Sequence, residues 1–182
     1  SRFLRAGPAY GGSCFPKDTR ALVSTGRMFK TNLSVVKSVI NSNDKRSNLL
    51  LNKISKIMGN KIKNKKITFL GVTFKPGTDD MRESSSLKMI PALSRKGAYI
   101  NYYDPTGKKK DFKSKNINFF ENVKDACESA DLIIIHTEWN EFKQLNFKKI
   151  SKKRNFKVFD MRNLYSTSEM KKNKINYFSI GR

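Results

Sequence analysis

Apolar residues recur every three or four positions in the first third of the chain, which is the spacing of a helix face. This pattern predicts one helix over about residues 17–29 and a longer helical stretch over about residues 33–58. The middle of the longer stretch, residues 41–46, is polar. Two helices and one bent helix therefore fit this stretch equally well, and Gly59-Asn60 provides its end.

From residue 66 onward the pattern changes to short apolar runs separated by amphipathic stretches. Runs without polar alternation are typical of strands that are buried on both faces. Strands that alternate with helices indicate βαβ units, so the predicted fold class is α/β, a doubly wound parallel sheet preceded by helices. The Lys- and Asn-rich segment before the sheet predicts a boundary between domains over 1–60 and 61–182. The predicted strands are 66–72, 99–103, 131–136, 157–160 and 177–180, and the helices between them are about 84–96, 123–130 and 142–150.

Charge, apolar runs and cysteine content together restrict the kinds of partner and function that we expect for this chain. The formal net charge is +23, but the basic residues are spread over most of the chain, which favours an enzyme of anionic substrates over a nucleic-acid-binding module. No apolar run approaches the ~20 residues of a membrane helix and no signal-peptide pattern is present, so we expect neither nucleic acid nor membrane as a partner. Cys14 and Cys127 lie in unrelated contexts, which indicates reduced thiols in the cytoplasm.

The most informative stretch is Gly11-Gly12-Ser13-Cys14-Phe15-Pro16-Lys17-Asp18. Two glycines allow a tight turn, and a cysteine just before a helix lies where the helix dipole favours its thiolate. Asp18 follows one helical turn later, so a nucleophile and a carboxylate can face one small volume. A buried structural cysteine on a glycine turn explains the same spacing equally well.

Ligands of doubly wound sheets bind beyond the carboxyl ends of the strands. Lys75, Arg82 and Arg162 follow predicted strands and could surround one anionic ligand, although ordinary surface charge accounts for each of them singly. The first strand leads into Gly71-Val72-Thr73, so the dinucleotide fingerprint G-x-G-x-x-G is absent here. His136 has no cluster of ligands around it, and we assign no metal.

Three motifs occur together and in order: the cysteine motif above, Phe74-Lys75-Pro76-Gly77-Thr78-Asp79-Asp80-Met81-Arg82-Glu83-Ser84, and Asp160-Met161-Arg162-Asn163. With them the chain resembles the nucleotide-sugar 6-dehydrogenases, the family of UDP-glucose and GDP-mannose dehydrogenases, over almost its whole length. Within this family the resemblance is greatest to the enzymes that oxidise UDP-glucose. GDP-mannose or another nucleotide sugar stays open as the substrate, since base recognition does not follow from these motifs.

The resemblance implies a two-step oxidation of the sugar C6 alcohol to a carboxylate with NAD, through a thiohemiacetal and a thioester on Cys14. It implies a Rossmann-like UDP-sugar-binding domain at the C-terminus, and Asp18 as the group that assists water in the last step. The implied substrate-binding residues are Arg5, Ala6, Gly7, Pro8, Ala9, Tyr10, Gly11, Phe74, Lys75 and Arg162, and the implied cofactor-binding residues are Cys14, Lys17 and Arg82.

The chain also departs from the family pattern. The N-terminal NAD-binding domain and the catalytic lysine and asparagine of the central segment are missing, so we expect the C-terminal part of a longer protein. Residues 1–182 alone should then lack dehydrogenase activity. Ala9 and Met161 stand where glycine is usual or frequent. The helices over 17–58 are expected to form a homodimer interface in the full-length protein.

Overall fold

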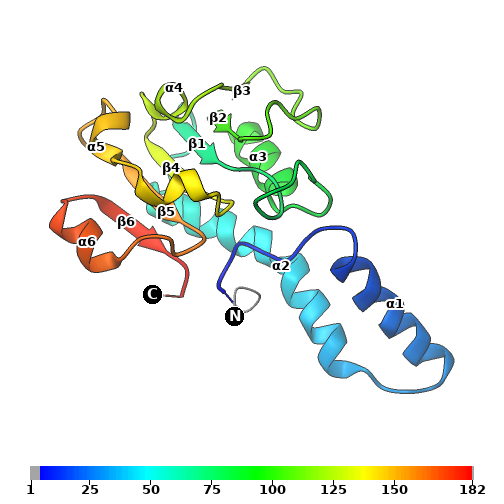
Figure 1. The fold of residues 1–182 in the computed structure, drawn as a ribbon. Helices are drawn as coiled ribbons and strands as arrows, with labels where there is room; N and C mark the ends of the chain where they lie inside the picture. The colour runs from blue at the N-terminus through cyan, green and yellow to red at the C-terminus, as the bar shows by residue number, and fades with distance from the viewer. Residues whose placement is uncertain (1–4, 182) are drawn as a thin grey trace.

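Two long helices open the fold. The computed structural model describes residues 5–181, and its first elements are α1 (Phe15–Met28) and α2 (Ser34–Ile57). They run side by side as a hairpin whose tip projects away from the rest of the molecule (Figure 1). The polar middle of α2 does not interrupt it, so the stretch predicted as two helices or one bent helix is a single helix of 24 residues.

A six-stranded sheet follows, in the order β3-β2-β1-β4-β5-β6. Every neighbouring pair is parallel, so the predicted doubly wound parallel sheet is confirmed. All strands therefore end at one edge, where the loops after β1, β4 and β5 lie close together. The strands are β1 (Lys66–Leu70), β2 (Tyr99–Tyr103), β3 (Ile117–Phe119), β4 (Leu132–Ile135), β5 (Lys157–Asp160) and β6 (Asn176–Ser179).

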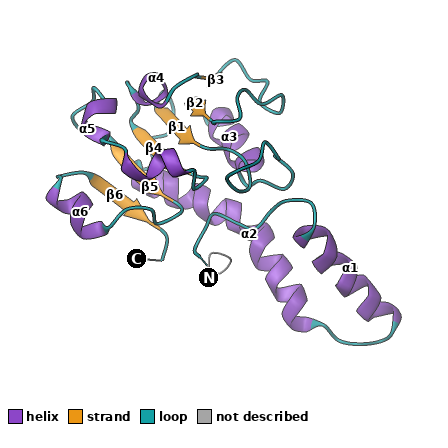
Figure 2. Cartoon of the chain, in the orientation of Figure 1, coloured by secondary structure: helices purple, strands orange, loops and turns teal. Residues whose placement is uncertain are grey.

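Helices cover both faces of the sheet (Figure 2). The C-terminal half of α2 and α3 (Ser86–Arg95) pack on one face, where Ile54, Phe69 and Phe159 are fully buried. The other face carries α4 (Val123–Cys127), the 3₁₀ helix η2 (Asn140–Gln144), α5 (Phe147–Ile150) and α6 (Thr167–Lys172). Successive residues of β1 and β4 point to opposite clusters, which explains why their sequences read as uninterrupted apolar runs.

Two elements were not predicted, and one predicted element is divided. β3 has only three residues, none fully buried, and α6 is a short polar helix that buries Met170 alone. The helix expected over 142–150 is instead η2 and α5, separated at Leu145 and Asn146. The strand expected over 66–72 ends at Leu70, because Gly71 adopts a φ of 74° and turns the chain away.

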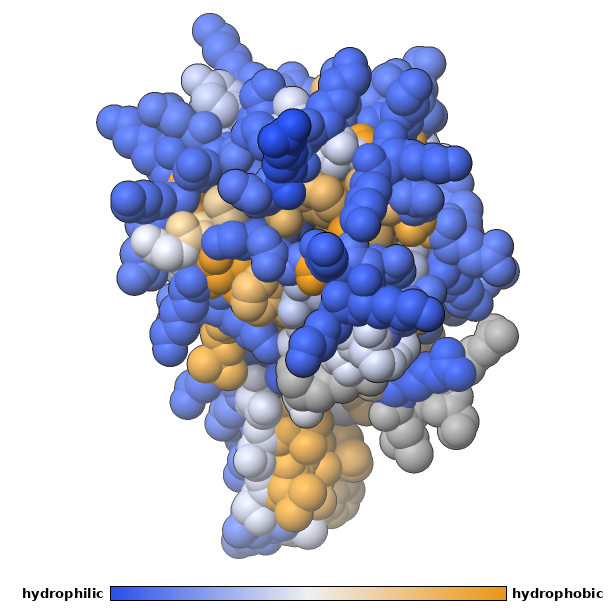
Figure 3. All heavy atoms as spheres, turned by 90° about the vertical axis from the view of Figure 1, so that its left-hand side faces the viewer, coloured by the Kyte–Doolittle hydropathy of each residue, from blue (hydrophilic) through white to orange (hydrophobic). Residues whose placement is uncertain are grey.

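The projecting hairpin has an apolar surface. Met28, Phe29 and Val35 expose about three quarters of their surface near its tip, and Leu22 of α1 exposes about half. Figure 3 shows an orange, apolar side on the projection at the bottom of the molecule, below a largely hydrophilic body. Within residues 5–181 no helix combines the length and the apolar character that a membrane span requires.

Candidate functional site

The turn after β1 lies where a doubly wound fold commonly receives a dinucleotide phosphate. Here the turn is already occupied by protein groups. The Val72 N–H donates to the Asp104 carboxylate at 2.8 Å, and Lys109 pairs with the same buried carboxylate at 3.7 Å. A Cβ on Gly71 would lie 2.5 Å from Thr137 Cβ, so Thr137 closes the turn from the other side. A ligand of this sheet must therefore bind elsewhere along its carboxyl edge.

Two adjoining hollows lie beside the loops that follow β1, β4 and β5. One of about 460 Å³ is lined by the turn at Pro76 and Gly77 and by Glu138 and Trp139. The other, of about 530 Å³, is lined by Ala6 and the segment from Arg162 to Leu164. Both include Arg5 and Lys143, so they are neighbours. Their volumes fall in the range of small-molecule sites, and the three basic side chains suit an anionic ligand.

Asp160, fully buried at the end of β5, holds the chain segment that carries Arg162. One of its oxygens accepts from the Arg162 N–H at 2.8 Å and the other from the Leu164 N–H at 2.7 Å. The Arg162 guanidinium then donates to two carbonyls on two other loops, from Nε to His136 at 2.9 Å and from Nη2 to Phe74 at 3.1 Å. Burial lowers the pKa of Arg162, while Glu138 and Asp160 act in the opposite direction.

His136 is a buried neutral side chain beneath this site. Its Nε2 lies 2.8 Å from the Ser85 hydroxyl and its Nδ1 lies 3.1 Å from the Thr137 hydroxyl. Burial, with a smaller contribution from Arg162, lowers its pKa to about 3. Among residues 5–181 no three His, Cys, Asp or Glu side chains are grouped as a metal site would require.

Cys14 precedes the first residue of α1, and its side chain is exposed. The Asp18 N–H donates to the Cys14 carbonyl at 2.8 Å, so the two residues are one helical turn apart, as the sequence predicts. Asp18 also pairs with Lys17 at 3.5 Å, and both side chains remain largely exposed. Cys127, by contrast, is fully buried in the core. The arrangement leaves an accessible thiol at the positive end of a helix dipole, with an exposed carboxylate one helical turn further along α1.

The cysteine loop is docked on the loop between β1 and α3. The Gly12 N–H donates to the Arg82 carbonyl at 2.8 Å. A Cβ at Gly11 would lie 2.5 Å from the Glu83 carbonyl oxygen, and one at Gly12 would lie 2.8 Å from the Phe74 ring. These two positions require glycine, because the loops approach each other too closely for a side chain.

The charged residues at this junction are mostly paired. Arg20 of α1 reaches Glu83 at 3.2 Å and Asp44 of α2 at 3.8 Å. Arg82 forms a forked pair with Asp80, with a closest approach of 2.8 Å, and this bond lowers the pKa of Asp80. The Arg82 pKa is raised by Asp80 first and also by the nearby Cys14. Arg82 therefore lies on the cysteine side of the junction.

The substrate residues implied by the resemblance lie in three places. Arg5, Ala6 and Arg162 line the hollow of about 530 Å³, and a Cβ at Gly7 would lie 2.7 Å from the Arg162 guanidinium. Phe74 lies between this hollow and the cysteine loop, with the Lys75 ammonium 5.4 Å from its ring centre. Pro8 is buried beside Gly7, and Gly11 packs on Glu83. Ala9 and Tyr10 line a separate hollow of about 210 Å³ with Asn43 and Glu83.

Two residues that hold this loop were missed in the sequence. Asn43 and Arg46, on the middle of α2, contact the backbone of residues 7–10 through their side chains. The available signal was the polar interval 41–46 within an otherwise amphipathic helix, which was interpreted only as a possible break. Asp104, Asp160 and Glu83 also support the loops of this site, and the sequence did not point to them in this role.

Comparison with known proteins identifies the family. Residues 68–167 match the family model described as "UDP-glucose/GDP-mannose dehydrogenase family, UDP binding domain". Residues 1–45 match the central domain of the same family. The chain belongs to the UDP-glucose/GDP-mannose dehydrogenase family. The match to the UDP-binding domain includes Phe74, Lys75 and Arg162, and the match to the central domain includes Cys14 and Asp18.

Individual members of the family agree with this assignment. UDP-glucose 6-dehydrogenases of Rickettsia typhi and Rhizobium meliloti are 40% and 41% identical over 98% and 100% of this chain. A solved UDP-glucose dehydrogenase of Pyrobaculum islandicum superposes with a TM-score of 0.78 at 25% identity, covering 96% of this chain and 38% of its own. The chain spans about 42% of the length of the curated relatives it matches.

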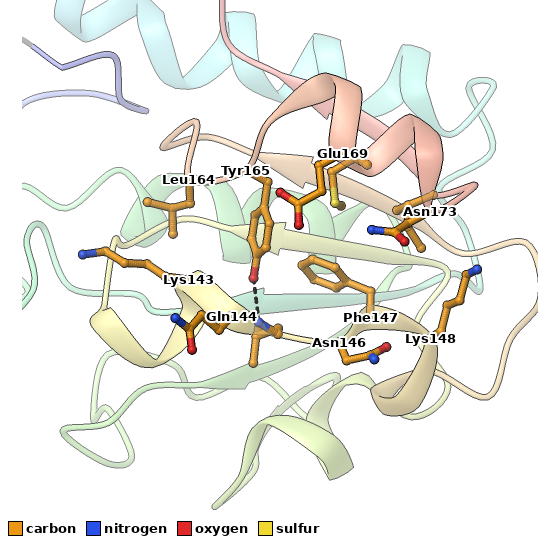
Figure 4. A pocket seen from close by; sticks show the side chains of 12 residues that line it. Lys143, Gln144, Asn146, Phe147, Lys148, Leu164, Tyr165, Glu169 and Asn173 are labelled. Atoms are coloured by element: carbon orange, nitrogen blue, oxygen red, sulfur yellow. Dashed lines mark hydrogen bonds between the residues drawn. The ribbon is translucent and has the colours of Figure 1, made fainter.

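This member of the family has a further hollow of about 400 Å³ between η2, α5 and α6. Figure 4 shows Tyr165 at its centre, with its hydroxyl accepting from the Leu145 N–H at 2.9 Å. Burial is the main cause that raises the Tyr165 pKa to about 12. The hollow adjoins the Arg162 region through Lys143 and Leu164, but it contains none of the residues that the family motifs imply.

Proposed function

We propose that the full-length protein oxidises the C6 alcohol of UDP-glucose to the carboxylate of UDP-glucuronate in two NAD-dependent steps. The observation that carries the proposal is the exposed Cys14 thiol one helical turn from Asp18, on a loop docked against the UDP-binding domain. An aldehyde cannot be oxidised to an acid by hydride removal until a nucleophile has added to its carbon. Cys14 is the residue in this loop with that chemistry.

The adjoining hollows support a nucleotide sugar as the ligand. Arg5 and Arg162 would neutralise the diphosphate, and Arg162 is pre-oriented because its bonds to His136 and Phe74 fix the guanidinium. Gly7 and Gly11 bring the backbone of the substrate loop close to Arg162 and Phe74. A sugar attached to the diphosphate would then extend along this loop toward Cys14.

The residues of this chain perform the covalent steps. The Cys14 sulfur adds to the aldehyde carbon, a C–S bond forms, and the carbonyl oxygen takes a proton. Removal of a hydride and a proton from this thiohemiacetal leaves a thioester on Cys14. Water then attacks the thioester carbon, Asp18 accepts a proton from the water, the C–S bond breaks and the sulfur leaves as thiolate.

NAD would contact this chain over only part of the NAD-binding site. When bound, it accepts one hydride in each oxidation. Arg82 lies near Cys14, and Lys17 follows this cysteine on the first turn of α1; these exposed cations would hold NAD from this side. The turn after β1 is closed by Asp104 and Thr137, so the fold described here does not supply the usual dinucleotide site. We propose that an N-terminal cofactor domain supplies it, and that residues 1–182 alone are inactive.

GDP-mannose is the second candidate substrate, because the family model names both classes of enzyme. Competition separates the two. Full-length protein is titrated with UDP-glucose, GDP-mannose, UDP and GDP in a calorimeter at fixed salt. We expect UDP-glucose to bind at least about tenfold more tightly than GDP-mannose, with UDP retaining part of the affinity. The reverse order would keep the mechanism and change the substrate, and binding of neither would remove the functional assignment.

We propose that residues 1–60 are the end of a central domain that forms a homodimer, and that residues 61–182 form the UDP-sugar-binding domain of a cytoplasmic enzyme. The support for the dimer is the apolar tip of the α1–α2 hairpin, where Met28, Phe29 and Val35 are the most exposed large apolar side chains. Large contiguous apolar patches are rare on the surface of monomeric proteins, and where they occur they often mark interaction sites.

Placing a charge in this surface should separate the subunits. We expect Phe29→Asp and Val35→Asp, each in the full-length protein, to weaken the dimer by at least about tenfold, because an aspartate would have to be buried without a partner. Light scattering after size exclusion, over a range of concentrations, gives the dissociation constant. Thr31→Asp, on the exposed loop between the helices, adds the same charge without removing an apolar side chain. Thr31→Asp should leave the dimer unchanged, and a dimer that neither Phe29→Asp nor Val35→Asp weakens would contradict this interface.

A further inference from the structure

The side chain of Asn43 hydrogen-bonds both backbone groups of Tyr10. Its Oδ1 accepts from the Tyr10 N–H at 3.0 Å, and its Nδ2 donates to the Tyr10 carbonyl at 3.2 Å. Only a primary amide offers a donor and an acceptor in this arrangement. The pair is partly buried and joins positions that are 33 residues apart in the sequence. Asn43 therefore fixes the orientation of one peptide unit on each side of Tyr10.

Arg46, one turn further along α2, holds the preceding part of the same loop. Its Nε donates to the Pro8 carbonyl at 3.0 Å, and its Nη2 donates to the Gly7 carbonyl at 2.9 Å. Bonds from a guanidinium to two acceptors are charge-assisted and directional. Together the two side chains hydrogen-bond four backbone groups of the loop. These are the carbonyls of Gly7, Pro8 and Tyr10 and the N–H of Tyr10.

The same contacts leave a defined set of backbone groups free. Pro8 has no N–H, and the Tyr10 N–H is taken by Asn43. The N–H groups of Gly7, Ala9 and Gly11 have no hydrogen-bond partner in the part of the chain that the structure describes. Opposite the loop, Gly7 faces the Arg162 guanidinium and Gly11 faces Glu83 and Phe74. These free donors lie beside the region proposed for the nucleotide sugar.

Besides the contacts of Asn43 and Arg46, the loop is held by the bond from the Gly12 N–H to the Arg82 carbonyl and by packing of Gly7 and Gly11 on neighbouring loops. Residues 5–12 form no helix or strand, and three of them, Gly7, Gly11 and Gly12, lose more conformational entropy on ordering than any other residue type. α2, by contrast, is anchored: Leu50, Leu51 and Ile54 bury its C-terminal half against the sheet. A side chain on α2 thus ties a glycine-rich loop to the rigid core of the UDP-binding domain.

We propose that Asn43 and Arg46 are positioning residues for the nucleotide sugar. They touch no reacting atom; they fix the loop so that its free N–H groups face the ligand, and the inference rests on the proposed function. If they act in this way, the affinity for the nucleotide sugar falls when they are removed, while the chemical step and the affinity for NAD change little. A purely structural role would instead lower thermal stability and the active fraction, with the Michaelis constant for the sugar unchanged.

The test uses the full-length protein and four variants on one helix. We expect Asn43→Ala to raise the dissociation constant and the KM for UDP-glucose about tenfold and Arg46→Gln by about ten- to a hundredfold, with kcat and the KM for NAD within about twofold of wild type. Asn48→Ala and Lys45→Gln are the matched controls, because both residues are exposed on α2 and contact neither the loop nor the hollows. Both controls should leave every constant unchanged.

Two conservative variants sharpen the result. Asn43→Asp keeps the acceptor for the Tyr10 N–H but places a carboxylate against the Tyr10 carbonyl, so it should be no better than Asn43→Ala. Arg46→Lys offers one point donor for two carbonyls and should recover only part of the affinity. Sugar affinity within about twofold of wild type in both Asn43→Ala and Arg46→Gln would overturn the proposal, as would a loss confined to kcat. Wild-type protein that binds no nucleotide sugar would instead refute the proposed function, and with it the premise of this role.

Discussion

Replacing Cys14 by serine should abolish uronate formation by the full-length protein, with a loss of at least about a thousandfold in turnover. The serine hydroxyl keeps the shape of the side chain but is a far weaker nucleophile near neutral pH, so the aldehyde is not captured. The exposed position of Cys14 before α1 makes the thiol available to substrate and to reagents alike. Formation of NADH and uronate is followed directly with UDP-glucose as substrate.

The second cysteine provides the control. Cys127 is fully buried beneath the sheet, where burial raises its pKa strongly and keeps it as an unreactive thiol. Cys127→Ala should therefore retain turnover at the cost of some stability. Iodoacetamide should modify Cys14 alone in the folded protein, and UDP-glucose should slow that reaction. A Cys14→Ser protein with more than about a tenth of wild-type turnover would refute covalent catalysis by this residue.

Replacing Arg162 by glutamine should weaken UDP-glucose binding by about a hundredfold. The substitution removes a half-buried cation from the hollow and leaves the carbonyls of His136 and Phe74 without their donor. Since Asp160 holds the backbone through the N–H groups of residues 162 and 164, the loop itself should survive the change. Isothermal titration with UDP-glucose and with UDP measures the loss, and thermal unfolding verifies that the variant is folded.

Two further variants show whether the weaker UDP-glucose binding comes from the lost charge or from the lost hydrogen bonds of Arg162. Arg162→Lys preserves the charge but cannot bond two carbonyls on separate loops, so we expect it to recover less than half of the lost binding free energy. Arg154→Gln removes an exposed arginine before β5 and should bind as wild type does. A dissociation constant within about threefold of wild type for Arg162→Gln would show that the ligand lies elsewhere on this edge of the sheet.

Most helices and strands of the fold could be predicted from the local pattern of apolar and polar residues. The bounds of β2 and β5 agree with the predicted ranges because aromatic and β-branched residues, which favour strands, predominate in β2 and form the centre of β5. β3 was missed because it is three residues long and only half buried, so its place depends on pairing with β2 rather than on its own sequence. α6 was missed for a similar reason, since a single buried residue gives no periodicity.

The residues of the candidate site also divide into those whose relation follows from local spacing and those that only the fold brings together. The relation of Cys14 to Asp18 is a helical i to i+4 spacing, which is visible in the sequence and present in the structure. The contacts of Asn43 and Arg46 with residues 7–10 span more than 30 positions, and no local rule indicates them. Lys75, Arg82 and Arg162 were expected around one ligand. The structure places Arg82 in a fork with Asp80 near Cys14 and Arg162 in the lining of the hollow, two placements that the positions after the strands do not indicate.

The central claim is that Cys14 allows one enzyme to perform two successive oxidations on one sugar. The most direct measurement is the amount of NADH formed per UDP-glucose consumed by the full-length protein, taken to completion with NAD in excess. We expect two NADH for each sugar and UDP-glucuronate as the product, with the thioester on Cys14 trapped in acid-quenched samples. A ratio of one NADH, with a free aldehyde as the product, would contradict it.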